Sequence, residues 1–333
     1  MKKYELTNET KTVEGKTLYR IKALRDFWNI KKGGLGGFVE SEDNLSQDDN
    51  CWIFSTALVY DNARVSDNAH VLENAKIYQS ARVSGSSRVY GNAKASGNSE
   101  IFGNTSIFDN AMISGNAKVF GDAGVFGSAQ IFGNAIVSSN VVISGDARVF
   151  GNAEVFGNAK VFGSAQIFDN AHIFENSCVY GKSKISGDAW IFGYAKIFDS
   201  AEVQEKAWIY DSVQISKHAH VLGEANVHGL AQVTGNTSIS DSAKIYGCAF
   251  ISDDAKISGN ALIYGFAKIL GNAEITDDVW IYEHAEVSGS TKISGKVRVC
   301  GNSILSRNEH ILGNMVISKS RFTSWEDGFN EKI

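Results

Sequence analysis

The chain has 333 residues, contains no proline and carries a formal net charge of −5 at pH 7. Acidic and basic residues are interspersed rather than grouped in runs, which argues against nucleic acid or an anionic membrane as the main partner. The sequence has no long apolar run, and polar residues follow Met1 where a signal peptide would be apolar. We therefore expect a soluble, cytoplasmic protein with neither a membrane nor a nucleic-acid partner.

Residues 1–38 differ from the rest of the chain because they lack its internal repeat. Alternation of apolar and polar residues over Lys3–Thr7 and Lys16–Leu24 predicts two short strands, joined through Glu14 and Gly15. The glycine-rich stretch 33–37 predicts a tight turn, and phosphate binding there is disfavoured because no helix start or Lys-Ser/Thr pair follows. We assign residues 1–38 to an N-terminal β cap.

The rest of the chain is organised by a six-residue repeat. An aliphatic residue returns at every sixth position from Ile53 to Ile317, and only Ala95 in this column is not a large aliphatic. The same spacing already relates four earlier residues: Val39, Leu45, Cys51 and Ala57. We assign residues 39–318 to the repeat and 319–333 to a C-terminal tail that caps the open strand edge.

The repeat itself indicates how the chain turns. Residues 119–124 read Val-Phe-Gly-Asp-Ala-Gly, and the third and fourth positions hold small residues that tolerate the positive φ of a sharp corner. Side chains alternate along a strand, so the aliphatic residue and the alanine point inward, while the second and sixth residues point outward. Three corners close a triangle, which predicts an all-β, single-stranded parallel β-helix of about 15 coils.

The Ile/Val-x-Gly-Asn-Ala-x unit resembles the hexapeptide repeat of left-handed β-helix proteins. Residues 18–27, 33–42 and 50–53 resemble, in addition, the YdcK-like hexapeptide-repeat proteins of bacteria and prophages. This likeness spans nearly the whole chain and implies a left-handed helix. It also implies membership of a superfamily classed with acyltransferases, whose acyl donor would be acetyl-CoA.

Acyltransferases with this repeat resemble one another in a loop inserted between coils, which helps to hold the pantetheine arm, and in a histidine base near a subunit interface. No hexad between residues 53 and 317 is interrupted, so the loop is absent here. Histidine is the natural general base near neutral pH. The candidates, if the chain is an enzyme, are His218, His220, His228 and His284.

Cysteines offer no second kind of site. Cys51, Cys178, Cys248 and Cys300 are far apart in the sequence, so we expect reduced thiols. Neither a CxxC pair nor a Cys/His cluster is present, and we expect no metal. Outside the acyltransferase alternative, we expect no cofactor.

Stacked coils bring residues 18 positions apart into register, and one face then collects aromatic side chains. The predicted interaction face consists of Trp190, Phe192, Trp208, Tyr210, His228, Tyr246, Leu262, Tyr264, Trp280 and Tyr282. Such a ladder has two explanations. It stabilises neighbouring strands, by about 0.2–1 kcal/mol per stacked pair. Alternatively, it is the surface that binds a partner, because monomers seldom expose large apolar patches. We expect a non-catalytic, rigid β-solenoid that self-associates or docks a protein partner through this face. The alternative is an acetyl-CoA-dependent acyltransferase.

Overall fold

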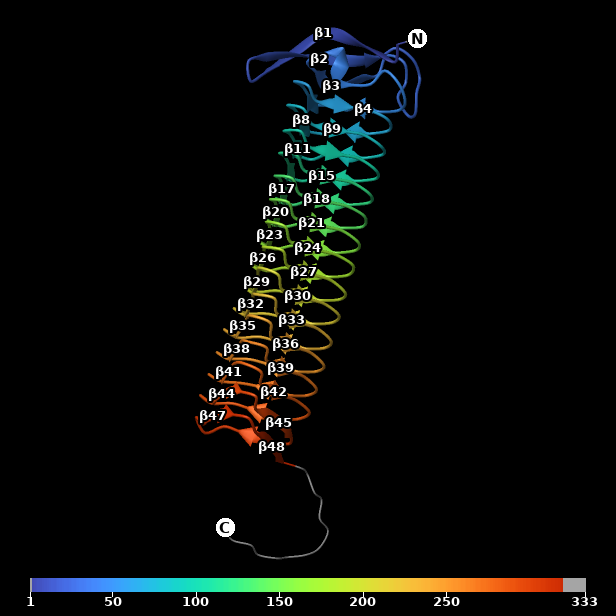
Figure 1. The fold of residues 1–333 in the computed structure, drawn as a ribbon. Coiled ribbons are helices and arrows are strands. Elements are labelled where there is room, and N and C mark those ends of the chain that lie inside the picture. The colour runs from blue at the N-terminus through green and yellow to red at the C-terminus, as the bar shows by residue number, and fades with distance from the viewer. Residues whose placement is uncertain (1, 320–333) are drawn as a thin grey trace, which may run out of the picture. The chain divides into compact units, whose positions relative to one another are not determined.

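The computed structural model describes residues 2–319, and the chain divides into two units, Met1–Tyr210 and Asp211–Ile333, which we treat separately. The predicted all-β parallel solenoid is confirmed in each (Figure 1), and it is consistent with the left-handed sense that the resemblance implies. Of the predicted C-terminal tail, only Lys319 lies within the described residues. Within residues 2–319, no helix has the length and apolar character that a membrane span requires.

The first unit begins with three strands that do not belong to the repeat. β1 (Tyr4–Val13) and β2 (Lys16–Ala23) pair antiparallel around a turn in which both Glu14 and Gly15 have positive φ. The two predicted strands are thus confirmed, although β1 extends further than expected. β3 (Leu35–Val39) pairs antiparallel with β2 and parallel with β5 (Leu58–Val59), so it joins the cap to the first coils.

The prediction of a tight turn for the glycine-rich stretch is wrong for most of that stretch. Gly33 does turn the chain, with φ of +88°, but Gly36 and Gly37 lie in β3. A Cβ atom on Gly36 would lie 2.5 Å from Cγ1 of Ile21 and 2.6 Å from the carbonyl oxygen of Ile53. These two glycines therefore serve the close packing of the cap on the first coil rather than a turn.

The first coil departs from the regular register. Val39 pairs with Val59, and Leu45 forms a bridge with Val65, so this coil contains two residues more than the later ones. The expectation that Val39 and Leu45 share the register of the later hexads is therefore wrong, although both are buried. The regular register holds from Cys51 onward.

The two additional residues lie between Leu45 and Ile53, which are eight positions apart rather than six. A short 3-10 helix, η1 (Glu42–Asn44), precedes them. The Asn44 side-chain amide donates to the main-chain carbonyls of Asp61 and Ala63, at 2.9 Å each. Its carbonyl oxygen accepts from the main-chain N–H groups of Glu40 and Ser41. One buried asparagine thus satisfies the polar groups that the irregular coil would otherwise leave without partners.

In the first unit, the repeat forms strands of two residues from β4 (Trp52–Ile53) to β30 (Trp208–Ile209), each starting six residues after the previous one. They stack in three parallel columns. The cap face continues β3 and contains β5, β8, β11, β14, β17, β20, β23, β26 and β29. The pocket face contains β4, β7, β10, β13, β16, β19, β22, β25 and β28. The tryptophan face contains β6, β9, β12, β15, β18, β21, β24, β27 and β30.

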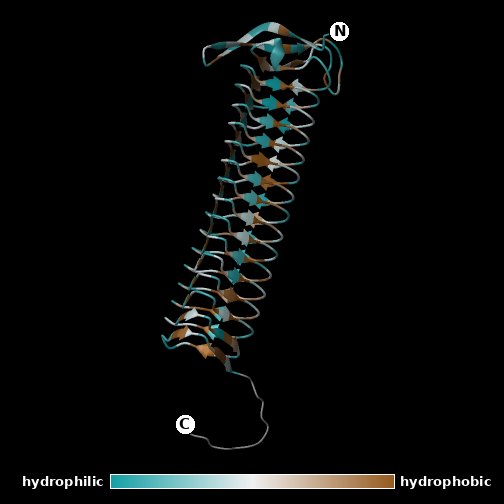
Figure 2. Ribbon diagram, viewed as in Figure 1, coloured by the Kyte–Doolittle hydropathy of each residue, from teal (hydrophilic) through white to brown (hydrophobic). Residues whose placement is uncertain are grey.

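The predicted division between interior and surface is confirmed. Ala135 and Val137 are fully buried, whereas Ile136 between them faces outward and is half-buried. Each coil bonds to the next, as in the 2.9 Å bond from the Lys118 N–H to the Ala135 carbonyl. Hydrophobic and hydrophilic residues consequently alternate in short stretches along every coil (Figure 2).

Corner residues carry the backbone strain of the fold. Glycine supplies the positive φ at many corners, but Asp109, with φ of +57°, shows that an acidic residue can take its place. Its carboxylate accepts a hydrogen bond from the Gly127 N–H of the next coil, at 3.1 Å. The bond offsets part of the cost of the left-handed conformation.

The second unit repeats this architecture. Its two-residue strands run from β31 (Gln214–Ile215) to β43 (Glu286–Val287) at the same six-residue interval. Five further strands follow: β44 (Lys292–Gly295), β45 (Arg298–Gly301), β46 (Ile304–Leu305), β47 (His310–Gly313) and β48 (Val316–Lys319). One of its three columns, the tyrosine face, contains β33, β36, β39, β42, β45 and β48.

Candidate functional site

The predicted interaction face lies on one sheet within each unit. On the tryptophan face, Trp190 stacks on Trp208 with ring centroids 5.5 Å apart, and Phe192 stacks on Tyr210 at 4.9 Å. Trp208 also meets Phe192 edge-on at 6.2 Å, which joins the two stacks. Trp208 is 44% exposed, whereas the other three residues are half-buried. These four side chains, the tryptophan cluster, form a rigid apolar patch on a flat sheet.

The ladder that leads to this cluster is interrupted. Phe102 stacks on Phe120 at 4.7 Å, and stacking resumes only with Phe156 and Phe174, at 4.9 Å. Ser138 occupies the rung between these two pairs. Stacked phenyl rings cover one another and leave mainly their edges to solvent, which agrees with a stabilising role for the ladder. Trp208, by contrast, retains a large exposed surface.

The aromatic rings on the tyrosine face of the second unit are covered more completely by their own neighbours than those of the tryptophan cluster. His228, Tyr246, Tyr264 and Tyr282 stack in sequence with centroids 4.9 to 5.0 Å apart. Trp280 is covered by the Arg298 guanidinium, whose central carbon lies 4.5 Å from the ring centroid. Such a cation over an indole competes with any partner for the ring. This face therefore offers less open apolar surface than the tryptophan cluster.

The four candidate catalytic histidines are not brought together. His218 and His284 are exposed at corners, and His220 is exposed on β32 (His220–Val221). His228 follows β33 (Asn226–Val227), which belongs to a different sheet of the unit from β32. Burial lowers the pKa of His228. Among residues 2–319, no group of three or more His, Cys, Asp or Glu residues could hold a metal ion.

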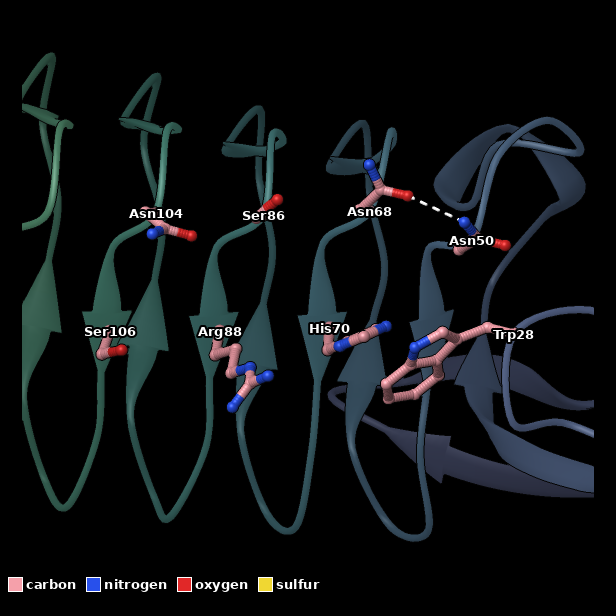
Figure 3. A pocket seen from close by; sticks show the side chains of 8 residues that line it. All are labelled: Trp28, Asn50, Asn68, His70, Ser86, Arg88, Asn104 and Ser106. Carbon is pink, nitrogen blue, oxygen red and sulfur yellow. Dashed lines mark hydrogen bonds between the residues drawn. The ribbon is translucent and has the colours of Figure 1, made fainter.

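A pocket that was not predicted from the sequence lies at the N-terminal end of the pocket face (Figure 3). Its volume is about 620 Å³. The strands β7 (His70–Val71), β10 (Arg88–Val89) and β13 (Ser106–Ile107) supply its floor through the outward residues His70, Arg88 and Ser106. One wall consists of corner side chains: Asn50, Asn68, Ser86 and Asn104. Trp28, from the cap, closes one end.

Trp28 and His70 stack on each other at one end of this pocket. The indole stacks on the imidazole with centroids 4.2 Å apart and planes 29° apart, and Phe54 meets the same imidazole edge-on at 5.5 Å. His70 is consequently only 7% exposed. Burial is the main cause that lowers the pKa of His70, and the Arg88 charge lowers it further, whereas a main-chain contact with Asn50 opposes both.

We expect the pKa of His70 to lie below its ordinary value of 6.5. A histidine that is buried in its neutral form stabilises the fold above pH about 6.5, and this stabilisation is lost as the pH falls below that value. Replacement Trp28→Ala uncovers the ring and should return the pKa toward 6.5. An NMR titration of the imidazole measures both values, with Trp190→Ala as the control. An unshifted pKa of His70 in the wild-type protein would contradict this interpretation.

A comparison with protein families agrees with the repeat architecture. Residues 57–73 and 129–145 match the model of the YdcK β-solenoid repeat. No curated protein matches the chain. Among solved structures, the chain is similar to the crystal structure of a "putative acetyltransferase" from Desulfovibrio desulfuricans G20, with 10% sequence identity over 85% of this chain and 71% of that one. The TM-score of that match is 0.18, and a likeness at this level carries no conclusion about chemistry.

Proposed function

Because the chain is a YdcK-like hexapeptide-repeat protein, we propose that it acts as a non-catalytic solenoid scaffold that self-associates through the tryptophan cluster. The observation that supports this most strongly is the 44% exposure of Trp208, whose ring is held by contacts with Trp190 and Phe192. A buried tryptophan contributes more to association than most residues, and an aromatic side chain fixed by its neighbours loses little entropy on binding.

A second copy of this chain is the partner that fits the surface. Acidic side chains of the tryptophan face have basic neighbours in the adjacent coil: Glu100 lies 3.5 Å from Lys118, and Glu154 lies 3.4 Å from His172. The cluster itself carries no charge that would select a charged partner. When two copies of the chain are related by a two-fold axis, the apolar patch of one copy can cover the same patch of the other. Two-fold dimers are the commonest assemblies of identical chains.

Other features are compatible with this role. Between residues 53 and 317, no loop interrupts the repeat in either unit. The coils therefore supply no inserted loop that could hold the pantetheine arm of an acyl carrier. The four cysteines are free, as suits a reducing compartment such as the cytoplasm. Catalysis by the candidate histidines would need groups from elsewhere, because His220 and His228 lie on separate sheets.

Trp208→Glu combined with Tyr210→Lys should convert the protein to a monomer without loss of the fold, because both residues point away from the interior. Size-exclusion chromatography with light scattering gives the mass, and circular dichroism reports the fold. The matched control, Lys160→Glu with Phe162→Lys, places the same charges at the same repeat positions on the pocket face. It should keep the wild-type mass. A wild-type protein that stays at its monomer mass of 36.1 kDa would refute self-association.

A further inference from the structure

The pocket between the cap and the pocket face has the composition of an anion site. Arg88 places a guanidinium on its floor, and none of the residues that line it is acidic. On the adjacent strands, the partners of Arg88 are His70 and Ser106, and neither carries a negative charge. A guanidinium presents its N–H groups in a fork that matches the two oxygens of a carboxylate or phosphate. The preferred occupant therefore bears such a group.

The corner side chains that line the pocket include a hydrogen-bond donor, the side-chain amide of Asn68. Elsewhere the corner asparagines form ladders in which each amide donates to the next, as from Asn134 to Asn152 at 2.9 Å. At the pocket, Asn50 donates to Asn68 at 3.0 Å, but the following rung is Ser86 rather than a third asparagine (Figure 3). The side chains of Asn68 and Ser86 make no hydrogen bond with each other. The amide N–H groups of Asn68 thus lack the asparagine acceptor that they would have elsewhere.

Trp28 is held in place at a conformational cost. It lies in a tight turn in which Phe27 and Ile30 exchange main-chain hydrogen bonds of 3.1 and 2.8 Å, and its φ is +41°. Bulky residues rarely adopt positive φ, and such strain is concentrated at binding sites. The turn presents the indole at the mouth of the pocket, where one face rests on His70 and the residue remains 55% exposed. The part of the indole that His70 leaves uncovered is therefore available for contact with a planar group.

We propose that this pocket binds a small organic anion, whose carboxylate or phosphate group pairs with Arg88 and whose planar part rests against Trp28. The Asn68 amide and the Ser106 hydroxyl complete the polar contacts. The fold favours this arrangement because charge and aromatic surface lie on opposite sides of His70, as Figure 3 shows. The site lies on the pocket face and not on the tryptophan face, so its occupation does not depend on self-association.

Calorimetric titration of the full chain with benzoate and with phenyl phosphate tests the proposal, and their relative affinities distinguish a carboxylate from a phosphate site. Benzyl alcohol is the neutral probe of similar shape. We expect saturable binding of at least one anion, with a dissociation constant of about 1 mM or below, and much weaker binding of the alcohol. Replacement Arg88→Gln should weaken anion binding about tenfold or more, because it removes the charge that the anion pairs with and its charge-assisted hydrogen bonds.

Two further variants locate the site. Lys160→Gln removes a positive charge from the same face and the same repeat position, further along the first unit, and should leave the affinity unchanged. Trp28→Ala should weaken benzoate and phenyl phosphate but not inorganic phosphate. The proposal is overturned if neither aromatic anion binds saturably, if Arg88→Gln binds as tightly as the wild type, or if benzyl alcohol binds as tightly as the anions.

Discussion

Val137→Asp is expected to abolish folding of the coils around it, whereas Ile136→Asp, one residue earlier in β18 (Ile136–Val137), should be tolerated. Val137 is fully buried, and an aspartate there would place a carboxylate among aliphatic side chains without a hydrogen-bond partner. The cost is several kcal/mol, and about 4 kcal/mol or more is typical of an unpaired buried charge. The loss should spread to adjacent coils, because each coil is stabilised mainly by its neighbours.

Ile136 is the matched control for this experiment, because it faces outward between Lys118 and Glu154. An aspartate there remains in solvent, where attraction to Lys118 and repulsion from Glu154 oppose each other, so we expect a change of about 1 kcal/mol or less. Thermal unfolding followed by circular dichroism, together with the yield of soluble protein, compares the two variants. Equal melting temperatures would show that the alternation of inward and outward residues is not as described.

Gly36→Ala should destabilise the cap by about 3 kcal/mol, the upper end of the range that is typical of an overpacked core. The added methyl group would lie 2.5 Å from Ile21 Cγ1 and 2.6 Å from the Ile53 carbonyl oxygen, and a main-chain atom cannot move aside as a side chain can. Because Gly36 lies in β3, the effect should be greatest for the β1, β2 and β3 pairings. Hydrogen exchange of the cap amides, measured beside thermal unfolding, would reveal this localisation.

Gly124→Ala provides the comparison for Gly36→Ala. Gly124 also lies in a strand, β16 (Gly124–Val125), but a Cβ atom there would meet nothing within 4 Å. The expected change in the free energy of unfolding is within about 0.5 kcal/mol. If both alanines had the same small effect, the cap would not be packed as closely on the first coil as the distances indicate.

The aromatic residues show which contacts can be predicted from the repeat alone and which properties cannot. Because neighbours in a stacked coil lie 18 residues apart, the sequence predicts the contact of Trp190 with Trp208 and that of Phe192 with Tyr210, and both are present. It does not predict how much of each ring remains exposed. That depends on side-chain orientation, as in the edge-on contact of Trp208 with Phe192, which fixes one indole and leaves its outer surface open.

The pocket could be predicted only in part. The spacing of His70, Arg88 and Ser106 places them in one column, so the polar floor was accessible to the same reasoning that identified the aromatic face. The contribution of Trp28 was not, because this residue belongs to a segment without the repeat. Its position over His70 follows from the path of the cap, which the pairing of β3 with β2 and β5 determines.

The sequence by itself determined the solenoid, its interior and its register from Cys51 onward, because a six-residue period fixes which side chains alternate inward and which small residues turn each corner. Only the tertiary structure decided the features that break the period. These are the two additional residues of the first coil, the use of Gly36 for close packing, and the placement of Trp28 against His70. Each depends on contacts between a segment without the repeat and the coils, and such contacts have no periodic signal in the sequence.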